Sequence, residues 1–292
     1  MNLFLNQIVA GIASGAIYAC MALALVMIFQ AVNDLNFAQG EMATLATYFS
    51  WQLMHWGLPY WAAFLITIPA AFIGGIAIER VLFRPLVKAP ILTKVAGFIA
   101  LFSIINSATG LIWDYTIKAF PTPFGDARFL GSELISTHQA AMIGITLLML
   151  AGLFFFFQYT RTGLAMRASA SLSESARLVG INTSWMVALG WGMASAIGAV
   201  AGILIAPVVY LDPNMMVGVL IYGFAAAVLG GLTSPLGAVV GGFLFGIIEN
   251  MAGTYIPNVG DQLKLPIALA VIVCVLVVKP AGLFGRPIVR RV

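Results

Sequence analysis

Long stretches without a charged residue constrain this chain more than any other feature. Only 8% of its 292 residues are charged, whereas about a quarter of the residues in a soluble domain are. Seven runs lack Asp, Glu, Lys and Arg altogether: 1–33, 42–78, 95–113, 134–160, 178–211, 213–248 and 265–278. A bilayer span needs about 20 apolar residues and tolerates almost no charge. The sequence therefore predicts a protein that crosses a membrane several times.

The spans are predicted to be α-helices. The segment 22–29 is continuously apolar, whereas a transmembrane β-strand alternates apolar and polar residues. Pro, Gly and polar clusters divide the longer runs, and helices are expected near residues 8–30, 37–54, 60–78, 92–113, 139–159, 184–209, 216–232, 236–255 and 265–278. The predicted fold class is all-α: one polytopic transmembrane helical bundle of about eight or nine spans, formed as a single domain by residues 1–292.

Basic residues are concentrated in three segments. These hold eleven of the fourteen Lys and Arg residues: Arg80, Arg84, Lys88 and Lys94; Arg161, Arg167 and Arg177; and Lys279, Arg286, Arg290 and Arg291. Cytoplasmic loops carry such an excess, so these segments and the C-terminus are expected inside the cell. Nine spans would place the N-terminus outside, and eight spans with one re-entrant segment would place it inside. The net charge of +4 suits loops beside anionic lipid, and no nucleic-acid partner is expected.

The motifs of soluble catalysis are missing from the sequence. Without a G-x-x-x-x-G-K-[ST] motif, the chain is not expected to hydrolyse ATP by itself. His55 and His138 are the only histidines and fall in different loops, so no metal site is expected. We predict no catalytic residue, metal or cofactor. Transport, a channel or a structural membrane role remains.

A glycine-rich region is centred on Thr233-Ser234-Pro235. Gly237 and Gly241 are four residues apart, as are Gly242 and Gly246, and such pairs let helix backbones approach closely. Close helix contact is the simpler interpretation. The turn residues predict that two short helices meet here. Because broken helices at membrane depth lie within protein or line a cavity, this hairpin is also a candidate wall of a translocation path.

A short helix is expected within the predicted cytoplasmic loop at residues 161–182. Ser171 and Glu174 have the spacing of a capping box, and Gly180 suits a helix stop. Leu172, Ala176 and Val179 would form one apolar face. Two interpretations remain open, namely a helix that lies on its own bundle or at the lipid interface, and a helix that docks into a cytoplasmic partner.

Five ordered blocks bear a family resemblance. They are Gly11-x-x-x-Gly15-x-x-Tyr18-Ala19; Asn36-Phe37-Ala38-x-Gly40-Glu41; Gly180-Ile181-Asn182 after Arg167 and Ala176; Ala226 to Gly231 followed by Gly237 and Gly241; and Pro280-x-Gly282-Leu283-x-Gly285. Together they resemble the permeases of branched-chain amino acid ABC transporters over nearly the whole chain. The chain departs from that family at Gln39, usually His, at Gln30, usually Gly, and at Ser171 and Leu172, where acidic residues are common.

The residue patterns and the resemblance together give two sets of candidate functional residues. The expected ATPase-coupling residues are Arg167, Leu172, Glu174, Ala176, Val179, Gly180, Ile181 and Asn182. The candidates for the translocation path are Asn36, Phe37, Gln39, Glu41, Gly237, Gly241, Gly242 and Glu249. A helix cap would also explain Asn36, Gln39 and Glu41. Glu249 is either an intramembrane functional acid or a residue at the outer interface.

The resemblance further implies a bacterial inner-membrane permease subunit. Its expected partners are a second homologous permease, two cytoplasmic ATP-binding subunits, a periplasmic solute-binding protein and membrane lipid. The expected solutes are branched-chain or other hydrophobic amino acids, and urea, amides or aromatic carboxylates are alternatives. An ion-coupled secondary transporter is the rival class, and it would need further intramembrane carboxylates or broken-helix ion sites.

Overall fold

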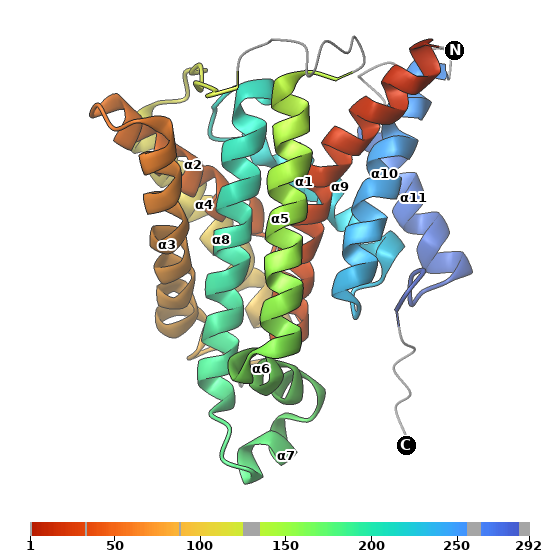
Figure 1. The fold of residues 1–292 in the computed structure, drawn as a ribbon. Helices are drawn as coiled ribbons and strands as arrows, with labels where there is room; N and C mark the ends of the chain where they lie inside the picture. The colour runs from red at the N-terminus through yellow and green to blue at the C-terminus, as the bar shows by residue number, and fades with distance from the viewer. Residues whose placement is uncertain (1, 33, 88, 125–134, 256–263, 286–292) are drawn as a thin grey trace. The chain divides into compact units, whose positions relative to one another are not determined.

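The computed structural model describes residues 2–32, 34–87, 89–124, 135–255 and 264–285. The chain divides into two compact units (Figure 1). Unit 1 comprises residues 1–26, 124–147 and 218–292, and unit 2 comprises residues 27–123 and 148–217.

Unit 2 is built from helices that pack along one another. It contains the end of α1 (Asn2–Val32), α2 (Gln39–His55), α3 (Tyr60–Ile78), the π-helix η1 (Glu79–Phe83), α4 (Ile91–Trp113), the end of α5 (Thr137–Tyr159), α6 (Arg161–Ser171), α7 (Ser173–Leu178) and α8 (Thr183–Val209). Helix α8 packs against both α2 and α3, and Trp191 is fully buried beside Phe83 and Phe98. Glycines permit the close contact between α3 and α8, since a Cβ on Gly75 or Gly192 would collide with backbone atoms of the facing helix.

Unit 1 contains most of α1, the start of α5, most of α9 (Met215–Gly230), α10 (Pro235–Tyr255) and α11 (Lys264–Val278). Helices α1 and α10 meet through glycines, because a Cβ on Gly15 would lie 2.9 Å from the Gly242 carbonyl oxygen. Helix α9 ends at Gly230 and α10 starts at Pro235, so the predicted break between two helices is confirmed. The expectation that both helices are short is wrong for α10, which has 21 residues.

The predicted all-α fold is confirmed. Eight of the nine expected helices match the observed bounds to within two residues at each end, and the first begins at Asn2 instead of residue 8. Within the part of the chain that the structure describes, six helices are long and apolar enough to cross a membrane by length and composition, and α9 and α11 are shorter apolar helices. Outside the helices, Lys118 and Leu211 form an isolated antiparallel bridge.

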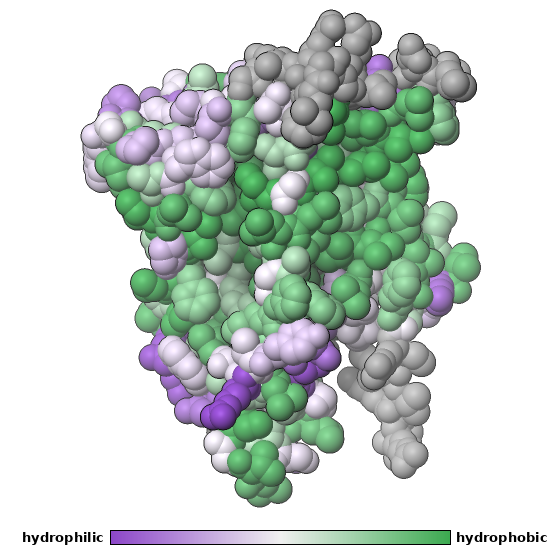
Figure 2. Space-filling model, viewed as in Figure 1, coloured by the Kyte–Doolittle hydropathy of each residue, from purple (hydrophilic) through white to green (hydrophobic). Residues whose placement is uncertain are grey.

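Two of the three basic segments meet at one end of unit 2. The Arg80 guanidinium lies 4.5 Å from the ring centroid of Trp185, near the start of α8 and close to α7 in the chain. At the start of α4, Lys94 forms a 2.9 Å salt bridge with Asp34, which follows α1. Figure 2 shows hydrophilic residues gathered at this end beside α6, and hydrophobic residues at the tip formed by α7. Of the third basic segment, Arg286, Arg290 and Arg291 lie outside the described residues.

This charge distribution makes a topology prediction. A cysteine at Ser173, exposed on α7, should react with an impermeant maleimide only from the cytoplasmic side, and one at Thr116, exposed beyond α4, only from outside. The experiment needs a Cys274→Ser background because Cys274 is exposed, whereas Cys20 is buried. The opposite labelling pattern would overturn the assigned orientation.

Candidate translocation and coupling sites

The first residue of α2 lies beside the middle part of α8 and not beside either end of that helix. Gln39, the first residue of α2, donates from Nε2 to the carbonyl oxygen of Ala194 at 2.9 Å. Ala194 lies eleven residues beyond the start of α8 at Thr183, which corresponds to roughly 16 Å of helix. Gly198, one turn further on, leaves room for the Gln39 amide. The segment between α1 and α2 therefore runs from the basic end of unit 2 into its interior.

The start of α2 is organised by an Asx turn. Asn36 Oδ1 accepts a hydrogen bond from the backbone N–H of Ala38 at 3.0 Å, two residues on. Ala38 is the N-cap residue, and it makes no side-chain cap bond. A helix cap therefore does not explain Asn36 and Gln39: Asn36 forms the turn before the N-cap residue, and the Gln39 side chain donates to Ala194 on α8. Glu41 does occupy the first turn, as expected.

Glu41 belongs to a polar cluster inside unit 2. Its side chain is 1% exposed and accepts from Asn106 Nδ2 of α4 at 3.3 Å. The same Asn106 amide lies 3.2 Å from the Pro213 carbonyl oxygen and 3.0 Å from Asn214 Oδ1. Asn106 and Asn214 were missed by the sequence analysis, although Asn106 is a polar residue within the charge-free run 95–113. This cluster joins α2, α4 and the segment before α9.

Phe37 differs from its neighbours in this segment. Asn36 and Ala38 are fully buried, whereas Phe37 is 44% exposed. Its ring is thus an apolar surface at the start of α2.

Glu249 lies in the interior of unit 1. It is 3% exposed, and it accepts a hydrogen bond from the Tyr18 hydroxyl at 2.8 Å. The rings of Tyr18, Tyr222 and Phe245 surround this contact, with centroids 5.2 to 6.0 Å apart. Tyr18 appears in the first family block, but its pairing with Glu249, 231 residues away, depends on the fold.

The candidate glycines Gly237, Gly241 and Gly242 are buried at helix contacts within unit 1. A Cβ on Gly241 would meet the Ala226 carbonyl oxygen, and a Cβ on Gly242 would meet the Ala19 backbone. Close helix contact, the simpler interpretation, is confirmed for all three. If these glycines contribute to the translocation path, they do so indirectly, because their close contacts set the positions of the helices.

The loop at 161–182 forms two helices, α6 and α7. The capping box predicted at Ser171 is wrong: Ser171 ends α6 and its hydroxyl donates to the Ala168 carbonyl oxygen. Leu172 separates the helices with φ −144° and ψ 82°. The stop predicted at Gly180 is confirmed. Gly180 has φ +86°, and the Gly180 and Ile181 N–H groups bond back to Arg177 and Ala176 in a Schellman motif.

The predicted apolar face of the coupling helix is divided by the fold. Ala176 is 4% exposed, whereas Leu172 is 67% and Val179 77% exposed, and Leu178 is 88% exposed. Ala176 is thus covered by this chain and is not available to a partner in this conformation. Arg177 Nε donates to Thr183 Oγ1 at 2.7 Å, and Asn182 caps α8 by accepting from the Trp185 N–H. Arg167 and Glu174 are exposed.

These features define a multi-pass helical membrane protein. Its family follows from comparison: the family described as "Branched-chain amino acid transport system / permease component" matches residues 7–278. The chain belongs to this family of transport permeases, whose members work in membrane complexes with other subunits.

Curated relatives match over nearly their full length. The high-affinity branched-chain amino acid transport system permease LivH of Salmonella typhimurium is 32% identical, over 99% of this chain and 98% of its own. BraD of Pseudomonas aeruginosa is 33% identical with the same coverage. A probable LivH of Methanocaldococcus jannaschii is 26% identical over 91% of this chain and 87% of its own. A solved structure, PsaBC from Streptococcus pneumoniae with Fab, aligns over 96% of this chain and 91% of its own at 13% identity and a TM-score of 0.47.

Proposed function

We propose that this chain is a transmembrane subunit of an ABC importer for branched-chain or other hydrophobic amino acids in the bacterial inner membrane, with a cytoplasmic C-terminus. ATP is hydrolysed by two partner ATPases, a second homologous permease completes the channel, and a periplasmic binding protein delivers the solute. Family membership and the names of the relatives support this assignment. The observation that carries the coupling part is the exposed apolar tip of α7.

The tip of α7 has the properties of a docking surface. Leu172, Leu178 and Val179 are exposed at the end of unit 2 where basic residues gather. Exposed apolar clusters rimmed by polar residues mark interaction sites. The tip is also held in place, because Ala176 is buried and Arg177 is bonded to Thr183. A groove on an ATPase would cover these side chains, and the Schellman motif and the Arg177 bond would transmit its movement to α8.

The translocation path is proposed to include the start of α2. Phe37 offers an apolar surface of the kind that a hydrophobic side chain would contact, and Asn36, Gln39 and Glu41 hold that surface in position through buried hydrogen bonds. In unit 1, Glu249 and the glycines Gly237, Gly241 and Gly242 would fix the helices that form the rest of the wall. We propose that a second permease subunit supplies the facing half.

Solute uptake tests the proposal. The chain would be reconstituted in proteoliposomes with its partner permease, both ATPases and the binding protein. Uptake of labelled leucine, isoleucine and valine should require ATP inside the vesicles and should not require an ion gradient. Urea, acetamide and benzoate serve as the comparison panel. Uptake driven by an ion gradient without ATP would favour the secondary-transporter alternative, and selective uptake of a panel compound would replace the assigned solute.

A further inference from the structure

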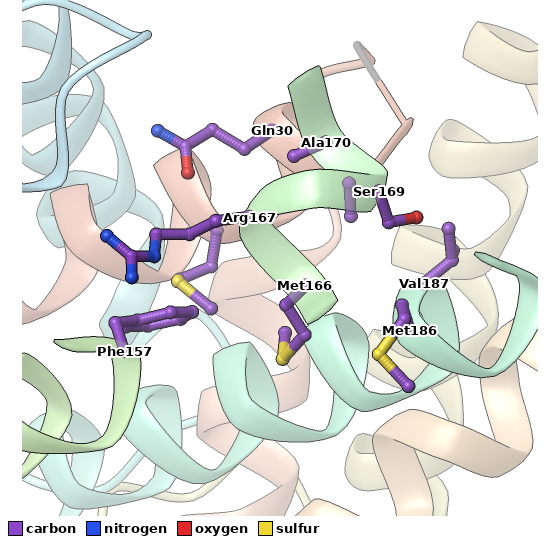
Figure 3. Close-up of a pocket in the computed structure, with 10 residues that line it drawn as sticks. Gln30, Phe157, Met166, Arg167, Ser169, Ala170, Met186 and Val187 are labelled. Carbon is purple, nitrogen blue, oxygen red and sulfur yellow. The ribbon is translucent and has the colours of Figure 1, made fainter. Parts of the chain in front are cut away.

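A pocket lies beneath α6 at the basic end of unit 2. It is a hollow with about 370 Å³ of empty space, a figure that includes open solvent, and the cavity volume within it is about 30 Å³. Its lining comes from the last turns of α1 and α5, from α6 and from the first turn of α8: Met27, Gln30, Ala31, Phe157, Met166, Arg167, Ser169, Ala170, Met186 and Val187. Figure 3 shows the polar ends of Arg167 and Gln30 on one side of the pocket and Met186 and Val187 on the other. The wall is mainly methionine and other apolar side chains, which adapt to flexible apolar chains.

The charge of the pocket has one sign. Arg167 is the only ionised residue among the ten that line it. Its guanidinium is exposed and contacts a neutral group, Gln158 Oε1, at 3.3 Å. Arg161, also exposed, begins the same helix. Of the two acids close in sequence to the lining segments, Asp34 is paired with Lys94, and Glu174 lies on α7. The pocket therefore suits a ligand whose anionic group lies at the rim and whose apolar part lies in the interior.

The surroundings of the pocket indicate where this ligand would come from. Phe155 and Tyr159 on the last turns of α5 are 59% and 73% exposed and stack on each other, and Leu164 on α6 is 60% exposed. These side chains form an exposed apolar surface on α5 and α6 at the level where the helices end. In the proposed orientation that level is the headgroup region of the cytoplasmic leaflet, where lipid is anionic.

We propose that this pocket binds an anionic phospholipid of the cytoplasmic leaflet, with the phosphate at Arg167 and part of an acyl chain against Met27, Met166 and Met186. Guanidinium groups bind phosphate oxygens through paired, charge-assisted hydrogen bonds. A lipid seated here contacts α1, α5, α6 and α8 together, so it would stiffen the support of the α6–α7 coupling segment. Lipid composition would thereby regulate coupling.

Native mass spectrometry of the full-length chain in detergent tests the site, with phosphatidylglycerol and phosphatidylcholine as the probes. Wild-type protein should bind phosphatidylglycerol more tightly. Arg167→Gln should lower phosphatidylglycerol affinity about fivefold, the effect of one basic residue at a lipid surface, and leave phosphatidylcholine affinity unchanged. Arg177→Gln is the matched control, since it removes the same charge from the same loop outside the pocket. Ala170→Leu fills the pocket without a charge change and should weaken binding of both lipids.

Equal wild-type affinity for the two lipids would overturn the proposal, whatever the variants do. It would also fail if Arg177→Gln lost as much affinity as Arg167→Gln, because the loop's general charge would then explain binding, or if Ala170→Leu bound lipid normally. The readout is lipid binding to the isolated chain, so these outcomes are separate from any failure of the transport assignment.

Discussion

Gly241→Leu should abolish solute uptake by preventing α10 from packing against α9. A Cβ at Gly241 would collide with the Ala226 carbonyl oxygen and would lie 2.7 Å from the Gly230 nitrogen. Both are backbone atoms, so no side-chain rotation can relieve the clash. Overpacking a tight contact costs about 1–3 kcal/mol or more, and the larger part of that range is expected when backbone must move. The measurement is uptake in proteoliposomes together with the amount of assembled complex recovered by gel filtration.

Gly144→Leu is the matched control for this substitution. Gly144 is in the same unit, on α5, and among the described residues no atom outside the adjoining part of its own helix lies within 4 Å of the position that its Cβ would occupy. It should assemble and transport normally, and the removal of a helical glycine slightly favours the helix. Normal uptake by Gly241→Leu would show that the contact between α9 and α10 tolerates separation, and would exclude this region from the translocation path.

Leu178→Glu should eliminate solute-stimulated ATPase activity while the chain still folds and inserts. Leu178 is 88% exposed, so in the isolated subunit the new carboxylate remains in water at little cost. In the complex it would enter the proposed apolar contact, where burying an unpaired charge costs several kcal/mol. The measurement is ATPase activity of the reconstituted transporter with and without loaded binding protein.

Leu178→Met keeps an apolar side chain of similar volume and should retain stimulation, since such exchanges are well tolerated. Ala176→Glu should behave differently from Leu178→Glu. Ala176 is buried within the chain, so its substitution should displace α7 and reduce the yield of folded subunit. Full stimulation in a Leu178→Glu complex would contradict the docking role and would leave α7 as a cover for the bundle's own end.

The helices could be predicted closely because lipid imposes one dominant rule on sequence. A charge in a span is so costly that charge-free runs mark the helices, and Pro235 and Gly230 marked the break between α9 and α10. The stop at Gly180 was equally predictable, since it depends on a left-handed backbone conformation that glycine adopts freely.

The roles of polar residues could not be predicted in the same way. Ser171 and Glu174 have the spacing of a capping box, yet Ser171 completes the preceding helix instead. Gln39 has the position of a capping residue, yet its side-chain amide donates a hydrogen bond to the carbonyl oxygen of Ala194, 155 residues away. A short polar side chain has several partners within reach, and its neighbours in space decide among them.

The sequence by itself determined the membrane class, the helices and the family, because each depends on local polarity or on ordered motifs spread along the chain. Only the tertiary structure decided that α2 starts inside unit 2, that Glu249 pairs with Tyr18, and that Ala176 is buried while Leu178 is exposed. Those facts depend on which segments far apart in the sequence come close together in space. Glycine contacts and buried hydrogen bonds decide this, and the periodicity of a local stretch of sequence does not reveal it.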